Sequence, residues 1–163
     1  MEEKTKIKRI NGYLHRISPM KDATGKVVNY TSSPVMVEFR PRDLLQVIIG
    51  SSILAIPLAF TEETWRLGET LPLFNTILLS VISLVFISVF VYFNFYRFML
   101  KDHILEFIKR IFSTFAVSLI VVGVILTIIQ KCPWQTDVLV AIKRILIVAF
   151  PASMSATISD VLK

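Results

Sequence analysis

The sequence contains few of the residues on which disulfides, metal centres and most catalytic sites depend. Its 163 residues include one cysteine, Cys132, and two histidines. One cysteine excludes an intramolecular disulfide framework, and two histidines leave little scope for a zinc site. Phosphate-binding glycine loops, Gly-x-Ser-x-Gly elbows and His-Glu-x-x-His motifs do not occur. We therefore predict no metal, no cofactor and no enzymatic activity, and an enzyme acting on a lipid would lack a nucleophile and a base.

Charged residues are also scarce in four long apolar stretches that follow residue 42. The chain is 54% hydrophobic, whereas soluble domains are about 45–50% apolar. A helix of about 20 apolar residues crosses the hydrocarbon layer of a bilayer, where only internal hydrogen bonds satisfy the backbone. We predict an all-α membrane protein: a four-span helical bundle over residues 42–163, behind a basic segment at 1–41. The spans are predicted at 43–60, 73–95, 111–129 and 138–158.

The last apolar stretch is irregular, and two interpretations of it stay open. Lys143 and Arg144 occur near its start, and Pro151 occurs near its middle. In one interpretation residues 138–158 form a fourth span, with two cations that extend toward the headgroups. In the other, residues 134–144 lie in the interface and a shorter span begins at Ile145.

The N-terminal segment carries nine Lys or Arg residues against four acidic ones up to residue 42. Apolar residues at helical spacing predict a basic amphipathic helix over residues 1–17, and a solvated tail is the alternative. The turn-forming run 22–25 separates two β-prone runs, which predicts a hairpin of 17–20 with 27–31. Residues 35–39 could add a third strand. Because a membrane protein places such basic residues on the cytoplasmic side, we expect no nucleic-acid partner.

The charges of the connections predict an orientation in the cytoplasmic membrane. The N-terminal segment and the 97–110 connection are basic, whereas the 61–70 connection is net acidic. Lys and Arg accumulate in cytoplasmic loops. With four spans, both termini are therefore predicted to face the cytoplasm.

Weakly polar residues line one side of the first predicted span. At 100° per residue they fall within a narrow arc, so they form one continuous stripe. Such a stripe either marks contact with another helix, where small residues allow close approach, or lines a hydrated path for ions. The residues of this stripe are Asp43, Gln46, Gly50, Pro57 and Thr61.

Two acidic residues follow the first span, and two basic residues open the fourth. In the predicted topology Glu62, Glu63, Lys143 and Arg144 all lie toward the outer face. Pairing of one acid with one cation would neutralise charges that are costly alone. Alternatively, Glu62 and Glu63 form an acidic mouth that attracts cations.

The run IPLAFTEETWRLGE, residues 56–69, resembles a stretch found in a prokaryotic family of integral membrane proteins of unknown function. The pattern is Pro-Leu, then a Thr, a Glu and Trp-x-Leu-Gly after a first span. A fainter likeness lies in FPASMSATISD, residues 150–160. The resemblance implies a multi-span membrane protein and brings no activity with it.

Four spans provide too little protein to enclose a wide path. We therefore expect the protein to form a homo-oligomer in the lipid bilayer, in which helices of different copies meet through small residues. We predict a small oligomeric ion channel or transporter, with cations slightly favoured. The alternative is a non-conducting membrane adaptor, whose basic N-terminal segment binds a cytosolic protein partner or lipid.

Overall fold

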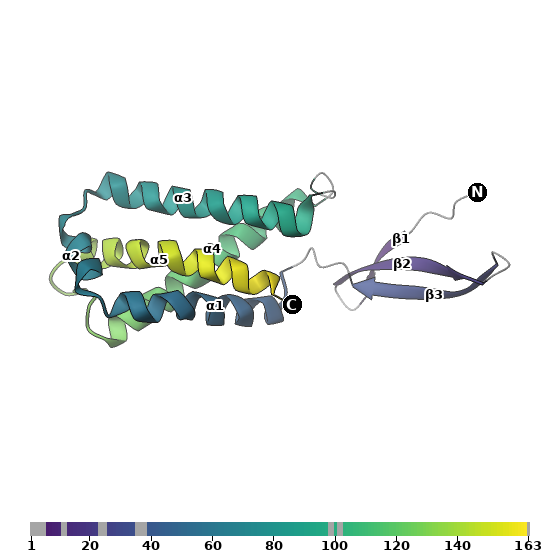
Figure 1. The fold of residues 1–163 in the computed structure, drawn as a ribbon, viewed down its shortest axis with the longest axis horizontal. Helices are drawn as coiled ribbons and strands as arrows, with labels where there is room; N and C mark the ends of the chain where they lie inside the picture. The colour runs from purple at the N-terminus through teal and green to yellow at the C-terminus, as the bar shows by residue number, and fades with distance from the viewer. Residues whose placement is uncertain are drawn as a thin grey trace. The chain divides into compact units, whose positions relative to one another are not determined.

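The computed structural model describes residues 6–10, 13–22, 26–34, 39–97, 100 and 103–162. The chain separates into two compact units, residues 1–38 and residues 39–163 (Figure 1). The first unit contains strands, and the second is helical.

The first unit is a three-stranded antiparallel sheet in the order β1-β2-β3. Its strands are β1 (Lys6–Ile10), β2 (Tyr13–Lys21) and β3 (Val27–Pro34). The predicted hairpin is confirmed, and the Asp22 carboxylate accepts a hydrogen bond from the Lys26 N–H at 3.1 Å where the chain turns. Residues 35–38 of the predicted third strand at 35–39 lie outside the described residues.

The predicted amphipathic helix over residues 1–17 is wrong where the structure describes this region. Lys6 pairs with Ile17, and Ile10 pairs with Tyr13, so β1 and β2 form a second hairpin. The two intervening residues are Asn11 and Gly12, a dipeptide that favours a tight hairpin turn. The helical spacing of the apolar residues was therefore misleading, because the described residues on both sides of this dipeptide pair as strands.

The second unit is the helical bundle, and its four long helices confirm the predicted four spans. They are α1 (Pro41–Ala59), α3 with its π-helical extension η1 (Leu73–Tyr96), α4 (Ile104–Ile128) and α5 (Val138–Val161). Each is long and apolar enough to cross a membrane. Residues 138–161 form one continuous helix, α5, so Lys143 and Arg144 lie within its first two turns. A short helix, α2 (Glu62–Thr70), joins α1 to α3 at one end of the bundle.

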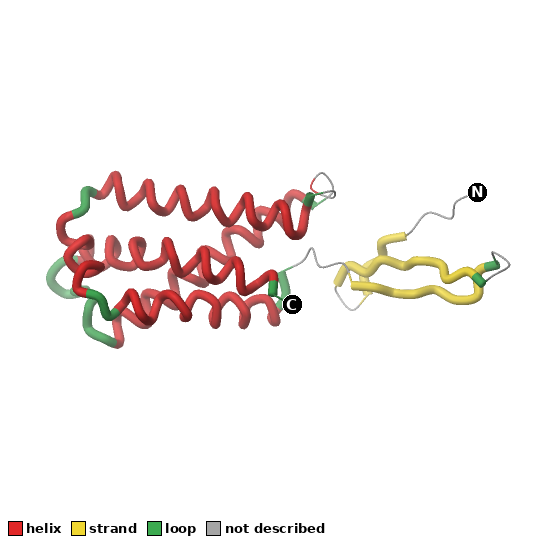
Figure 2. Tube along the Cα trace, in the orientation of Figure 1, coloured by secondary structure: helices red, strands yellow, loops and turns green. Residues whose placement is uncertain are grey.

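Local sequence explains where two spans begin. Pro41 is the first residue of α1, where its missing N–H costs nothing, and Asp43 accepts a hydrogen bond from the Arg40 N–H at 3.0 Å. Asp137 caps α5 by accepting from the Val140 N–H at 3.1 Å. Figure 2 shows that the connection between α1 and α3 and the connection between α4 and α5 lie at the same end of the bundle.

Helix α5 is the centre of the bundle, because it packs against α1, α2, α3 and α4. Its contacts use small side chains, and Ala149, Ala152, Ser153, Ala156 and Thr157 are at most 1% exposed. Many large apolar side chains are instead exposed, among them Phe74, Leu105 and Ile128, as expected for a surface that faces lipid. These small residues therefore pack against helices of the same chain.

Gly50 lies where α1 and α5 approach each other closely. A Cβ at this position would lie 2.9 Å from Ala156 Cα and would collide with the Ser159 side chain. We expect Gly50→Ala to lower the free energy of unfolding by about 1–3 kcal/mol, because the two helices must move apart. Unfolding in sodium dodecyl sulfate, followed by circular dichroism, measures the change.

Gly123→Ala is the matched control, because among the described residues a Cβ there would meet only Ile145 Cδ1, at 3.6 Å. This variant should be as stable as the wild type or slightly more so, since alanine favours the helix. Equal losses in the two variants would contradict a specific contact at Gly50.

Candidate functional site: two charged clusters in the bundle

A charged cluster lies where the first turns of α1, the second turn of α4 and the end of α5 meet. Its centre is Arg110, which is 0% exposed. Nε and Nη2 of Arg110 donate to Asp160 Oδ2 at 2.9 and 2.6 Å, and Nη2 lies 3.4 Å from Asp43 Oδ2. Both carboxylates are at most 2% exposed. We call Asp43, Arg110 and Asp160, with the aromatic residue Tyr96, the Arg110 cluster.

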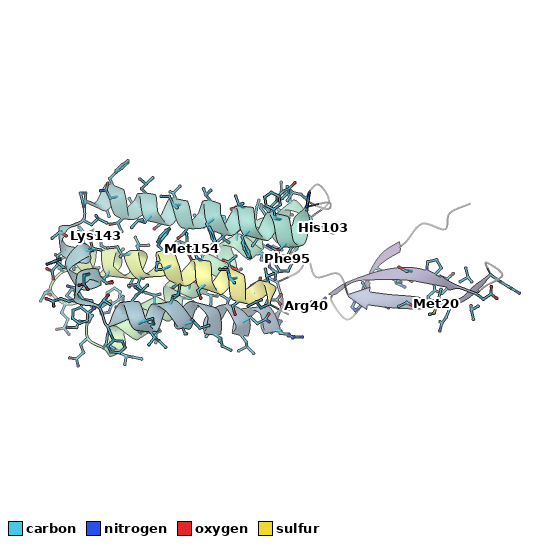
Figure 3. All side chains as sticks on the ribbon, viewed as in Figure 1. Met20, Arg40, Phe95, His103, Lys143 and Met154 are labelled. Carbon is cyan, nitrogen blue, oxygen red and sulfur yellow. The ribbon has the colours of Figure 1, made fainter. Side chains whose placement is uncertain are left out.

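Aromatic rings enclose the guanidinium of this cluster. The Phe95 ring centroid lies 3.9 Å from Arg110 Cζ, and that of Phe39 lies 5.8 Å away. Such cation–π contacts stabilise a desolvated cation. Phe95 and Tyr96 belong to the π-helical turn η1, an irregularity common at functional sites. Figure 3 shows Phe95 and Arg40 at the end of the bundle opposite Lys143.

The sequence singled out only Asp43 in this cluster and missed Arg110, Asp160 and Tyr96. Arg110 and Asp160 are 50 positions apart, and each stands at the edge of an apolar stretch, where a charge usually reaches water. The sequence nevertheless offered a reason to single out Asp160, because it is the one acidic residue between Val138 and Lys163.

A second cluster lies at the opposite end, where α2 packs on the start of α5. Arg144 is 8% exposed. Its Nε donates to the Trp65 carbonyl at 3.1 Å, and its Nη1 donates to the Lys131 carbonyl at 2.6 Å. Its Nη2 pairs with Glu69 Oε1 at 2.6 Å. We call Trp65, Glu69, Lys131, Lys143 and Arg144 the Arg144 cluster.

The acidic partner of Arg144 is therefore Glu69, not Glu62 or Glu63 as the sequence suggested. Glu62 and Glu63 are both exposed in the first turn of α2. The difference arises because residues 62–70 are helical rather than a loop, so Glu69 falls in the last turn. The negative end of a helix attracts cations, and Lys143 Nζ donates to the carbonyls of Glu69 and Leu71 at 3.2 and 2.8 Å.

The Trp-x-Leu-Gly pattern has a packing role in this cluster. A Cβ on Gly68 would collide with Arg144 Cγ, so glycine lets the arginine side chain cross α2. The Trp65 indole N–H donates to the Ala59 carbonyl at 2.8 Å, which ties α2 to the end of α1. Lys131 Nζ lies 3.7 Å from the centroid of the Trp65 ring.

The predicted stripe on α1 does not lie in one environment. Asp43 and Gly50 are buried in the bundle, and Gln46 is partly buried, with its amide donating to the Leu162 carbonyl at 3.3 Å. Thr61 donates to the Leu58 carbonyl at 2.8 Å, beyond the end of α1. Pro57 is exposed. The buried face of α1 instead passes from Asp43 through Val47, Ser51, Ala55 and Ala59.

Buried hydroxyl groups extend through the bundle between the two clusters. Ser153 Oγ and Ser83 Oγ are 3.3 Å apart, which joins α5 to α3. Most others donate to carbonyls of their own helix, as Thr157 does to Ser153 at 2.7 Å, an arrangement that satisfies them in an apolar medium. The Thr114 hydroxyl has no hydrogen-bond partner among the described residues. We call this set, each member at most 1% exposed, the hydroxyl seam: Ser51, Thr76, Ser83, Thr114, Ser118, Ser153 and Thr157.

Cys132 belongs to the apolar core beside the Arg144 cluster and is 8% exposed. Burial raises the pKa of its thiol, although the Thr127 hydroxyl and the Arg144 charge oppose the rise. The thiolate is the reactive form of cysteine. A raised pKa keeps Cys132 protonated at neutral pH and moves its ionisation to higher pH.

We therefore expect a maleimide to label Cys132 in the folded protein at least about tenfold more slowly than in the unfolded chain at pH 7.5. The folded rate should continue to rise above pH 8.5, the usual thiol value. Mass spectrometry of timed samples measures both rates. Equal rates in the two states would contradict the buried, protonated thiol.

Comparison with known proteins points to one family. A family model described as "Putative integral membrane protein (DUF2391)" matches residues 42–162. No curated protein and no solved structure matches the chain. Among the described residues, no group of three His, Cys, Asp or Glu side chains could hold a metal ion.

Proposed function

The chain belongs to this family of integral membrane proteins, and from that premise we propose that it is a small oligomeric ion channel or transporter rather than an enzyme. The Arg110 cluster carries the proposal. Charged side chains within membrane segments are costly, and where they occur they pair with one another and mark ion or proton pathways. Asp43 and Asp160 both present a carboxylate oxygen to one guanidinium. A cation that displaces Arg110 from either one would find an oxygen ligand, which favours cations over anions.

The hydroxyl seam supports a path from this cluster toward the other end of the bundle. Hydroxyl groups can exchange their helix carbonyl partners for a passing ion or water. The pair of Ser83 and Ser153 joins α3 to α5 partway along it. The proposed path thus runs beside α5 and replaces the α1 stripe suggested by the sequence. Because four spans cannot enclose a wide path alone, we include self-association in the proposal.

Cation flux into liposomes that contain the purified full-length protein tests the proposal. We expect flux above that of empty liposomes, and we expect Asp160→Asn to reduce it about tenfold or more. Glu106→Gln is the matched control, because Glu106 pairs only with the exposed Lys109 among the described residues. Flux is compared per folded protein, after gel filtration and circular dichroism. Wild-type flux equal to that of empty liposomes would remove the transport proposal.

The acidic mouth formed by Glu62 and Glu63 is a separate part of the proposal. Both side chains are exposed at the N-terminal end of α2, so they could concentrate cations near the bundle. The double variant Glu62→Gln, Glu63→Gln should then reduce cation flux at low ionic strength more than at high ionic strength. Unchanged flux at low salt would remove the mouth role and leave the path untouched.

We propose that both termini face the cytoplasm and that the membrane is the cytoplasmic membrane. Four spans place the start of α1 and the end of α5 at the same end of the bundle. The basic N-terminal region favours the cytoplasm for that end. Reporter fusions after residues 66 and 104 should then report opposite sides. The same side for both fusions would contradict the orientation.

A membrane adaptor is the second candidate, and the first unit favours it. Residues 1–38 form a compact unit of their own, and Met20, Val28 and Tyr30 are each about 60% exposed or more. Exposed apolar side chains on a small sheet suit a protein or lipid partner. Flux distinguishes the candidates, because a transport protein that lacks residues 1–38 should still conduct, whereas an adaptor should not conduct even at full length.

A further inference from the structure

We propose that a pocket beside the Arg144 cluster binds the headgroup of a phosphoethanolamine lipid. This inference does not depend on ion transport. The pocket has a volume of about 390 Å³ and lies between α2, the α4–α5 connection and α5. Its lining is mostly polar and contains both signs of charge. The lining residues are Glu62, Trp65, Arg66, Glu69, Gln130, Lys131 and Arg144.

The pocket lies at the depth of lipid headgroups. Helices α1 and α4 end at Ala59 and Ile128, and α3 and α5 begin at Leu73 and Val138. The lining residues of α2 and of the α4–α5 connection therefore follow the ends of spans. Arg144 is six residues into α5, which is about 9 Å at 1.5 Å per residue. Both tryptophans of the chain, Trp65 and Trp134, also occur here, as is typical of a membrane interface.

The charged side chains of the pocket that form no ion pair among the described residues carry both signs, as a zwitterionic ligand requires. Arg144 and Glu69 neutralise each other at 2.6 Å. Within the part of the chain that the structure describes, no ion pair involves Glu62, Arg66 or Lys131. Two cations can hold a phosphodiester by charge-assisted hydrogen bonds. One carboxylate, that of Glu62, can accept from a primary ammonium group.

This chemistry distinguishes among common headgroups. Ethanolamine ends in an ammonium group with N–H donors, so it can donate a hydrogen bond to Glu62. The trimethylammonium group of choline has no such donor, and glycerol headgroups carry no cation for Glu62. Trp65 forms one wall, held by its bond to the Ala59 carbonyl. The Lys131 ammonium beside that ring is therefore placed at the pocket edge.

Lipid binding to delipidated full-length protein in detergent, followed by native mass spectrometry, tests this site. We expect phosphatidylethanolamine to bind about tenfold more tightly than phosphatidylcholine or phosphatidylglycerol. Arg66→Gln and Lys131→Gln should each weaken it about tenfold. Glu62→Gln should remove the preference for ethanolamine over choline. Lys109→Gln is the matched control, because Lys109 is exposed and lies on α4 outside this pocket.

Four results would overturn the inference. Equal binding of the three lipids would exclude headgroup recognition, and wild-type binding by Arg66→Gln and Lys131→Gln would exclude this pocket. An unchanged preference in Glu62→Gln would exclude the ammonium contact. Free O-phosphoethanolamine that binds as tightly as the lipid would identify a soluble ligand instead. Arg66 and Glu62 are exposed, so their variants should fold, and none of these results depends on flux.

Discussion

Replacing Arg110 with methionine is expected to lower the free energy of unfolding by about 3–5 kcal/mol, the usual cost of removing one partner from a buried ion pair. The variant would leave Asp43 and Asp160 buried without the guanidinium that both now contact. The contacts of Arg110 with Phe95 and Phe39 would also be lost. Unfolding in sodium dodecyl sulfate, followed by circular dichroism, measures the change.

Two further variants separate this effect from simple loss of charge. Lys109→Met removes the neighbouring cation, whose side chain is 66% exposed, and should change stability by less than about 0.5 kcal/mol. Combining Arg110→Met with Asp43→Asn and Asp160→Asn should recover part of the loss, because no uncompensated charge stays buried. An Arg110→Met variant as stable as Lys109→Met would contradict the role of the cluster.

Replacing Arg144 with methionine is expected to destabilise the bundle by about 2–4 kcal/mol. The guanidinium donates to the carbonyls of Trp65 and Lys131 and to the Glu69 carboxylate. Hydrogen bonds to charged groups contribute about 1.5–3 kcal/mol each, but Glu69 is largely exposed, so its contribution is small. The loss should appear as detachment of α2, detected by faster proteolysis between residues 60 and 72.

Arg144→Lys distinguishes geometry from charge, because lysine keeps the charge and lacks the planar fork of donors. We expect it to recover less than half of the loss. Arg66 lies on the exposed side of α2. Arg66→Met should therefore leave the stability of the bundle and the rate of proteolysis unchanged. If Arg144→Lys were as stable as the wild type, the fork of hydrogen bonds would not be what holds α2.

The run from Thr61 to Gly68 has a clearer role in the structure than in the sequence. In the sequence this run was notable because it resembles a family pattern and because the predicted loop is net acidic. In the structure Trp65 and Gly68 fasten α2 to α1 and α5. Glu62 and Arg66, together with Trp65 itself, line the pocket that we assign to a lipid headgroup.

The candidate site was only partly predictable because its members are distant in the sequence. Asp43, Lys143 and Arg144 were singled out as charges at the edges of apolar stretches. Their partners could not be assigned, because the Arg110–Asp160 and Arg144–Glu69 pairs span 50 and 75 positions. Helical spacing shows which residues share a face of one helix. It does not show which neighbouring helix that face meets.

The sequence by itself determined that the chain has four membrane-spanning helices and approximately where they lie, because apolar length must match the bilayer and the backbone must bond internally. It also determined the 17–31 hairpin through its turn residues. Only the tertiary structure decided which charges meet, which face of α1 is buried and which acid pairs with Arg144. Those outcomes depend on how the helices pack around α5 and on the helical conformation of α2. The hydrophobic pattern does not determine this packing, because several arrangements of the same four spans would satisfy it.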